Sequence, residues 1–120
     1  MRRYKGRYFK VCIKKLAEGD TQQLVIDLFR DLGYKLELSE DNEWTFKKGS
    51  MIFTYAGLIN WELIFRRVIV SWLPASEEIC LTYIFPWATN IGLLSGAAKP
   101  ELIKIMKTLG SDKIKFIRKR

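Results

Sequence analysis

Residues 34–47 read YKLELSEDNEWTFK, two alternating stretches joined by a polar run, and this pattern decides the expected fold. On either side of the run SEDNE, residues 39–43, apolar and polar side chains alternate with a period of two. That period is typical of half-buried strands, and a short polar turn between two such stretches indicates a β-hairpin. We therefore expect an antiparallel sheet at the centre of the fold.

The same alternation predicts further strands on both sides of this hairpin. The expected strands are residues 7–16, 34–38, 44–47, 61–73 and 79–85, a last strand beginning at about residue 113 and ending in basic residues, and residues 51–55 as an optional addition. The strands at 61–73 and 79–85 are joined by a turn at 74–78 and are apolar on both faces. This composition indicates a central position in the sheet, or a partner on its second face.

Two further stretches have apolar residues at helical spacing. The first, residues 20–32, begins at Asp20, which can accept hydrogen bonds from the first turn, and ends before Gly33. The second, residues 100–109, has Pro100 in its first turn and ends before Gly110. The expected apolar stripes are Leu24, Val25, Leu28, Phe29 and Leu32 in the first helix and Leu102, Ile103, Met106 and Leu109 in the second.

The order of these elements predicts one α+β domain over residues 1–120. We expect a mainly antiparallel sheet of five to seven strands with two helices packed on one face, in the order β-α-β-β-(β)-β-β-α-β. A chain of 120 residues with 48% hydrophobic residues can bury a sufficient core without metals or disulfides.

Residues 79–98 form a stretch without charge and contain the spacing Gly92-x-x-x-Gly96. Both features also fit a membrane-spanning helix. The stretch contains Pro86, Asn90 and other polar residues, and its first half is rich in aromatic and β-branched side chains. We therefore expect a strand, a turn at Pro86 and a loop that leads to the second helix, and keep membrane association as an alternative.

The net charge of +8 is concentrated at the two ends of the chain. The basic ends are residues 1–7 and 113–120, and their basic side chains are Arg2, Arg3, Lys5, Arg7, Lys113, Lys115, Arg118, Lys119 and Arg120. If the first and last strands pair at the edge of the sheet, the two clusters form one patch that could bind a polyanion. Tyr4, Tyr8 and Phe116 lie among these charges, where exposed rings could stack on nucleic-acid bases.

The chain contains no histidine, which excludes a thiolate-imidazole nucleophile and a histidine-ligated metal. Cys12 and Cys80 fit no metal or redox motif; we expect unreactive side chains, with a disulfide between them possible but not required. No apolar segment follows the basic start, so we expect no signal peptide and a reducing, cytoplasmic location.

Motifs for catalysis or cofactors are also missing from the sequence. No glycine-rich phosphate loop is present, and we expect no cofactor. The acidic residues Glu37, Glu40, Asp41 and Glu43 are explained by a solvated turn. Glu62, in an apolar context, is expected to be buried, either opposite Arg66 or Arg67 as a structural ion pair, which we favour, or as a lone acid with a raised pKa.

These observations favour a small, non-enzymatic binding or assembly module. The expected partner is a polyanion, with nucleic acid favoured over an anionic membrane surface, and a protein partner or a second copy could use an apolar sheet face. The alternative is a small-ligand carrier or enzyme with an aromatic-lined pocket that Glu62, Arg66 and Arg67 face.

Overall fold

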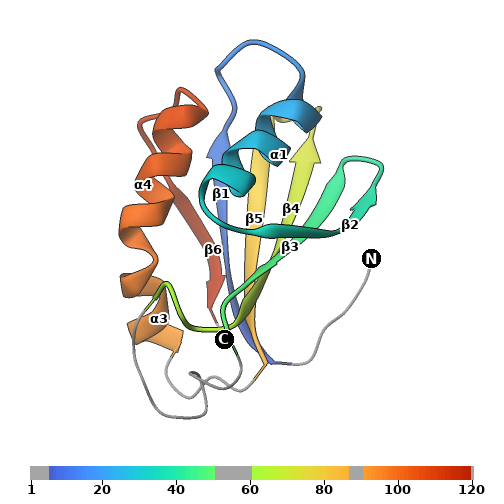
Figure 1. The fold of residues 1–120 in the computed structure, drawn as a ribbon. Coiled ribbons are helices and arrows are strands. Elements are labelled where there is room, and N and C mark those ends of the chain that lie inside the picture. The colour runs from blue at the N-terminus through green and yellow to red at the C-terminus, as the bar shows by residue number, and fades with distance from the viewer. Residues whose placement is uncertain (1–5, 51–60, 87–90, 120) are drawn as a thin grey trace.

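The computed structural model describes residues 6–50, 61–86 and 91–119 and has a six-stranded antiparallel sheet at its centre. The strands are β1 (Arg7–Lys14), β2 (Lys35–Glu40), β3 (Glu43–Lys48), β4 (Arg66–Leu73), β5 (Glu78–Phe85) and β6 (Lys115–Lys119). The helices are α1 (Thr21–Asp31), α3 (Ile91–Ala97) and α4 (Lys99–Thr108). The predicted α+β class, with two main helices on one side of the sheet, is confirmed (Figure 1).

The strands lie in the order β2-β3-β4-β5-β1-β6. The two strands expected to be central, β4 and β5, occupy the middle of the sheet, and residues of both faces are buried there, including Ile69 at 2% exposure and Ile84 at 5%. On the second face of this pair Ile69 and Ile84 are thus buried, whereas Leu73 at the end of β4 is 42% exposed. β6 pairs with β1, so the first and last strands lie side by side as predicted.

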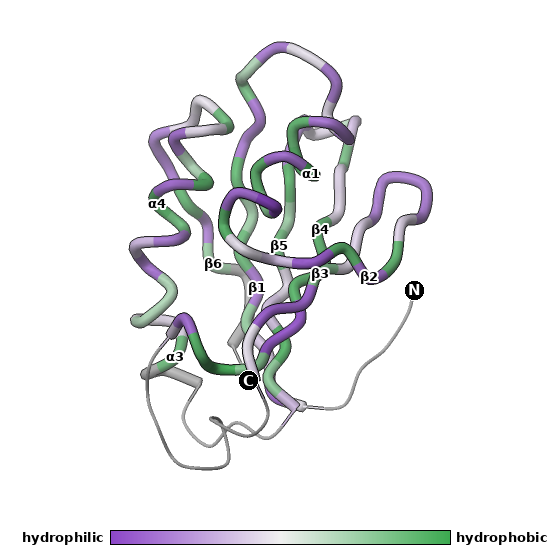
Figure 2. The backbone as a smooth tube through the Cα atoms, in the orientation of Figure 1, coloured by the Kyte–Doolittle hydropathy of each residue, from purple (hydrophilic) through white to green (hydrophobic). Residues whose placement is uncertain are grey.

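One core lies between the sheet and the helices. It joins β1 residues such as Phe9 and Val11 to Phe29 of α1 and Ile105 of α4. In Figure 2, α4 shows hydrophobic and hydrophilic residues in turn along its length, as expected for a helix with one buried face.

Local signals in the sequence explain where several elements begin and end. The Asp20 carboxylate accepts a hydrogen bond from the Gln23 amide at 3.3 Å and caps α1. Gly33 follows this helix with a φ of +91°, a left-handed conformation that glycine adopts at little cost. Gly49 also has a positive φ, +99°, and a Cβ there would lie 2.2 Å from the Ile64 carbonyl oxygen.

Three predicted elements differ from the structure. The strand expected at residues 7–16 ends at Lys14, and the strand expected at 61–73 begins only at Arg66, because residues 61–63 form a turn and Ile64 makes an isolated bridge to Ser50. The loop expected after Pro86 contains the helix α3. Within residues 6–50, 61–86 and 91–119, no helix has both the length and the apolar composition needed to cross a membrane. The optional strand at 51–55 lies outside the described residues.

The buried face of α4 is also shifted from the predicted stripe. Leu102 and Leu109 are buried as expected, but Ile103 is 43% exposed, and Ile105 and Glu101 point into the core instead. The buried face of α4 includes an acidic residue, Glu101, so a search for apolar spacing alone does not find this face. A charged residue is buried only where it has a partner, and the sequence does not show that partner.

Candidate functional site

The edge of the sheet formed by β1 and β6 brings the two ends of the chain together. The register places Cys12 opposite Lys115, Val11 opposite Phe116, Lys10 opposite Arg118 and Phe9 opposite Lys119, with an irregularity between Lys10 and Val11. Of the predicted polyanion-binding residues, Arg7, Lys113 and Lys115 are exposed. Arg118 and Lys119 belong to strand β6. Arg2, Arg3, Lys5 and Arg120 lie outside the described residues.

Basic side chains lie on the sheet face that points away from the helices. Val11 belongs to the core beneath the helices, and strand alternation therefore places Lys10, Lys14 and Lys115 on the opposite face. Lys14 and Lys115 are exposed, and Lys10 is half-buried. Adjacent strands lie only about 4.8 Å apart, so cations on neighbouring strands reinforce the same local potential.

Helix α4 adds basic residues that were not among the predicted site residues. Lys99, Lys104 and Lys107 are all exposed, whereas the only acid in the helix, Glu101, is buried. The solvent-facing side of α4 therefore carries positive charge alone. The spacing of these lysines in the sequence could have indicated that they are exposed, because residues 99, 104 and 107 do not coincide with the apolar positions 102, 105 and 109.

The aromatic residues near the basic ends differ in exposure. Phe116 is 41% exposed, and its ring centroid lies 6.2 Å from that of Phe9. Tyr8 is half-buried on the face that also carries Lys10. Tyr4 lies outside the described residues. Phe116 is therefore a partly exposed ring on the helix side of β6, whereas its neighbour Lys115 lies on the opposite face.

The three predicted pocket residues, Glu62, Arg66 and Arg67, lie in different surroundings. Glu62 has a side chain that is 67% exposed and pairs with Lys48, so the expectation of a buried acid was wrong. Arg66 is fully buried on the helix side of the sheet, whereas Arg67 lies on the other face and pairs with Glu37 at 2.9 Å. Strand alternation separates Arg66 from Arg67, and the turn at residues 61–63 removes Glu62 from the strand.

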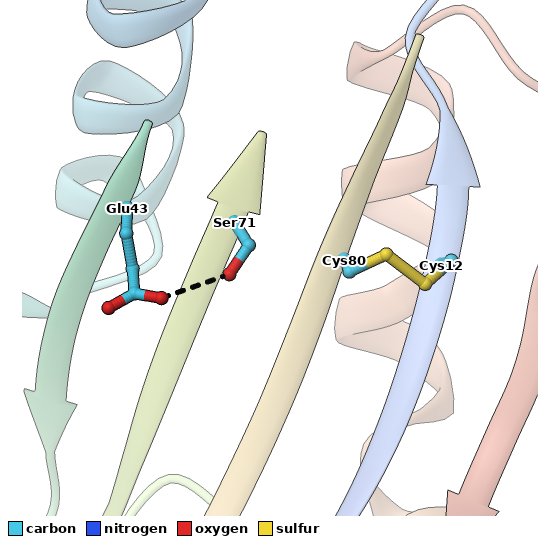
Figure 3. The surroundings of a disulfide bond; sticks show 4 residues. All are labelled: Cys12, Glu43, Ser71 and Cys80. Atoms are coloured by element: carbon cyan, nitrogen blue, oxygen red, sulfur yellow. Dashed lines mark hydrogen bonds between the residues drawn. A yellow bond between two sulfur atoms is a disulfide. The ribbon is translucent and has the colours of Figure 1, made fainter. Parts of the chain in front are cut away.

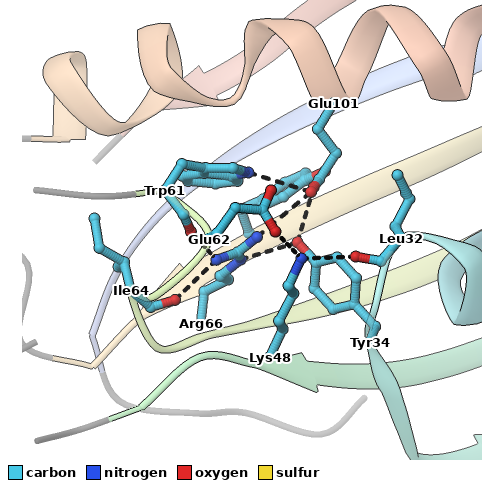
Figure 4. Close-up of polar contacts among 9 residues, drawn as sticks. Leu32, Tyr34, Lys48, Trp61, Glu62, Ile64, Arg66 and Glu101 are labelled. Carbon is cyan, nitrogen blue, oxygen red and sulfur yellow. Dashed lines mark hydrogen bonds and ion pairs between the residues drawn. The ribbon is translucent and has the colours of Figure 1, made fainter. Parts of the chain in front are cut away.

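Arg66 pairs instead with Glu101, whose side chain points from α4 toward the sheet (Figure 4). Their closest atoms, Nη2 and Oε1, are 3.4 Å apart. Oε2 of Glu101 accepts hydrogen bonds from the hydroxyls of Tyr34 at 2.8 Å and Tyr83 at 2.6 Å, and Oε1 accepts one from Trp61 Nε1 at 3.2 Å. Sequence reasoning missed Glu101 because its partner lies 35 residues away.

The guanidinium of Arg66 has other partners besides this carboxylate. Its Nε donates to the Tyr34 hydroxyl at 2.9 Å, and its Nη1 donates to the carbonyl oxygens of Ile64, at 2.9 Å, and of Trp61. The guanidinium carbon lies 4.1 Å from the centre of the Trp61 ring. Both charges of the pair are thus hydrogen-bonded, the condition under which a buried ion pair is tolerated.

This environment changes the acidity of the tyrosines. Burial, followed by the negative charge of Glu101, raises the pKa of Tyr34 and of Tyr83 well above the usual tyrosine value. At the exposed edge of the network, the hydrogen bond from Lys48 lowers the pKa of Glu62. The two tyrosines therefore stay neutral and donate hydrogen bonds to Glu101. These bonds help to hold α4 on the sheet.

Cys12 and Cys80 form a disulfide between β1 and β5 (Figure 3). The two residues face each other in the register of the strands and are 6% and 2% exposed. The sequence does not establish this bond, since the two cysteines are 68 positions apart. Disulfides persist mainly in oxidising compartments, whereas the sequence led us to expect a reducing one, and the location of the protein stays a prediction.

Among the acidic residues of the β2–β3 hairpin, Glu37 takes part in a surface charge network. Glu37 pairs with Arg67 and also with Lys47, at 3.8 Å. Across the described part of the chain, no three histidine, cysteine or acidic residues are grouped so that they could hold a metal ion. Charge pairing therefore explains Glu37, whereas Glu43 accepts a hydrogen bond from Ser71 at 3.5 Å and Glu40 and Asp41 are exposed in the hairpin.

Comparison with protein families, with curated proteins and with solved structures finds no match for this chain. The arguments about function therefore rest on the residues and their arrangement.

Proposed function

We propose that this protein is a non-enzymatic binding module that attaches to nucleic acid through the basic edge of its sheet. We define the basic edge by its described residues, Lys10, Lys14, Lys113 and Lys115. The antiparallel pairing of β1 with β6 carries the proposal, because it brings cations from the two ends of the sequence to one edge.

Charge arrangement supports a polyanionic partner. Like charges on adjacent strands repel each other, and a row of phosphates relieves this repulsion and releases counterions from the nucleic acid. β6 lies at the end of the strand order, so a long ligand can approach it from the side. A polyanion therefore fits this edge better than an uncharged ligand.

The alternative of a small-ligand carrier or enzyme has less support. Arg66, the one predicted pocket residue that faces the core, is fully buried and already paired with Glu101 and two carbonyl groups. A ligand at this position would have to replace these contacts. We therefore favour binding at the basic edge.

The test is binding of a fluorescently labelled 20-nucleotide oligonucleotide, measured by anisotropy at several salt concentrations. Replacing Lys113 and Lys115 with Gln should weaken binding and reduce the slope of log K against log salt by about 0.7 for each of these lysines that neutralises a phosphate. The matched control is Lys35→Gln with Lys47→Gln, two exposed lysines on strands at the opposite end of the sheet.

Circular dichroism should show that both pairs of substitutions leave the fold intact. Equal loss of affinity in both would mean that only the total charge matters, and unchanged affinity in the Lys113/Lys115 variant would refute the proposed site. Vesicles with and without anionic lipid serve as a further ligand. Tighter binding to anionic vesicles than to the oligonucleotide would assign the edge to a membrane surface.

A further inference from the structure

We infer that Cys12 and Cys80 form a thiol–disulfide exchange site that reacts with small anionic disulfides such as glutathione disulfide, with Cys12 as the attacking and Cys80 as the resolving cysteine. This activity is independent of nucleic-acid binding. Three features of the surroundings lead to the assignment: the sheet face that carries the bond, the charges beside each sulfur and the difference in exposure.

The disulfide lies on the sheet face that points away from the helices. Val11 and Leu81 belong to the core, and strand alternation places their neighbours Cys12 and Cys80 on the opposite face. The helices α1, α3 and α4 all contribute residues to that core, so none of these three helices covers the face with the bond (Figure 1). A small molecule can therefore reach the sulfurs by displacing surface side chains, without opening the core.

Positive charges gather on the Cys12 side of the bond. Cys12 lies opposite Lys115 of β6, and Lys10 and Lys14 are the next residues on the same face of β1. The Lys14 ammonium donates to the Ser76 carbonyl oxygen at 2.6 Å, so we assign Lys10 and Lys115 to the site. Cations beside a cysteine favour its thiolate, which is the form that attacks a disulfide.

The Cys80 side of the bond has acidic and neutral groups instead. Cys80 lies opposite Ser71 of β4, whose hydroxyl donates to the Glu43 carboxylate at 3.5 Å (Figure 3). Glu78 is the next residue on the same face of β5. Negative charge disfavours a thiolate, so Cys12 ionises more readily than Cys80 once the bond is reduced.

Exposure leads to the same division of roles. Cys12 is 6% exposed and lies on β1, next to the edge strand β6, whereas Cys80 is 2% exposed and lies on β5, between β4 and β1. The rate of attack on a disulfide depends on both the thiolate fraction and the access to the sulfur. Both quantities are greater for Cys12, which leaves Cys80 to close the bond.

The reaction starts from the reduced protein. The Cys12 thiolate attacks one sulfur of glutathione disulfide, forms a mixed disulfide with glutathione and releases the other glutathione as a thiolate. Cys80 then loses its proton and attacks Sγ of Cys12, which forms the bond seen in the structure and releases the second glutathione. Two electrons and two protons pass from the protein thiols to the two glutathiones, and the reverse sequence reduces the bond.

The charges of the site also select the disulfide. Glutathione disulfide has more carboxylates than amino groups and is anionic at neutral pH, whereas cystamine is a cationic disulfide. Lys10 and Lys115 attract the first and repel the second, and salt screens both effects. A disulfide with a structural role alone would show no such preference.

The first experiment mixes the reduced protein with glutathione disulfide or with cystamine and follows the reaction by acid quenching and mass spectrometry. The ratio of the two rates is divided by the same ratio for the neutral thiol N-acetylcysteine amide. This normalised ratio should exceed one and fall as salt is added. Lys115→Gln should lower it by about two- to fivefold, the effect of one exposed charge pair. The matched control is Lys35→Gln, an exposed lysine of the opposite edge strand β2, which should leave the ratio unchanged.

A second experiment tests the roles of the two cysteines. Cys80→Ala should accumulate glutathione on Cys12, because no resolving cysteine remains, whereas Cys12→Ala should gain glutathione on Cys80 much more slowly. Circular dichroism checks that both variants and the reduced protein are folded. In the reduced unmodified protein, which needs no substitution, iodoacetamide should label Cys12 about fivefold faster than Cys80 at neutral pH, because thiolates react and thiols do not.

Four results would overturn the inference. Equal labelling of the two cysteines, or faster labelling of Cys80, would contradict the assigned roles. A normalised ratio that is the same in Lys115→Gln and in the unmodified protein would contradict the selection of anionic disulfides. The absence of glutathione on either cysteine would remove the site itself. Reaction only in urea, at a rate that follows unfolding, would assign the bond a structural role alone. Oligonucleotide binding is measured separately, so its failure would leave this site standing.

Discussion

Removing the Glu101 carboxylate should be among the most damaging single changes in this protein. Glu101→Ala leaves Arg66, which is fully buried, without its countercharge, and leaves the hydroxyls of Tyr34 and Tyr83 and the indole N–H of Trp61 without their acceptor. Breaking a buried ion pair from one side costs about 3–5 kcal/mol. A domain of this size is stable by only about 5–15 kcal/mol, so a fifth or more of its stability should be lost.

The assay is urea unfolding followed by tryptophan fluorescence and far-ultraviolet circular dichroism. With a slope of about 2 kcal/mol per molar urea, a loss of about 4 kcal/mol lowers the midpoint by about 2 M. Glu101→Gln retains an acceptor oxygen and should lose less. Lys104→Ala, an exposed position of the same helix, should change stability by no more than about 0.5 kcal/mol.

Two results would refute this reasoning. The first is a midpoint for Glu101→Ala equal to that of Lys104→Ala, which would mean that the buried pair contributes nothing. The second concerns the double variant Arg66→Met with Glu101→Leu, which removes both charges together. It should be clearly more stable than Glu101→Ala, because no uncompensated charge remains. Equal losses would show that packing, and not charge, determines the effect.

Reduction of the Cys12–Cys80 disulfide, or its replacement by two alanines, should lower the free energy of unfolding by about 4 kcal/mol, since the bond closes a loop of 68 residues in the unfolded chain. Urea midpoints with and without reductant measure this, and coincident curves would contradict it. Because the pKa values of Tyr34 and Tyr83 are raised in the fold, their contribution to stability is complete below the unfolded tyrosine value of 10.0 and is lost as the pH rises above it. Absorbance at 295 nm should show that these two tyrosines ionise only together with unfolding, and ionisation of all five without loss of circular dichroism would contradict this. Gly49→Ala should destabilise the fold by more than about 1 kcal/mol, because the methyl group meets the backbone at Ile64; a melting temperature equal to that of the unmodified protein would argue against that close approach.

The sequence alone determined the features that depend on neighbouring residues. The alternation in residues 34–47 predicted the β2–β3 hairpin, and Asp20 and Gly33 marked the two ends of α1, because strand periodicity and helix capping act over a few residues. Alternation next to the basic ends also led to the correct prediction that the first and last strands pair.

Tertiary structure alone decided which distant side chains meet. Glu62 was expected to lie opposite Arg66 or Arg67 but pairs with Lys48, and Arg66 pairs with Glu101. The buried face of α4 likewise contains Ile105 and not Ile103. The cysteine pair was likewise left open by a separation of 68 residues. The free energy of burying a charge depends on its partner across the core, and local pattern carries no information about that partner.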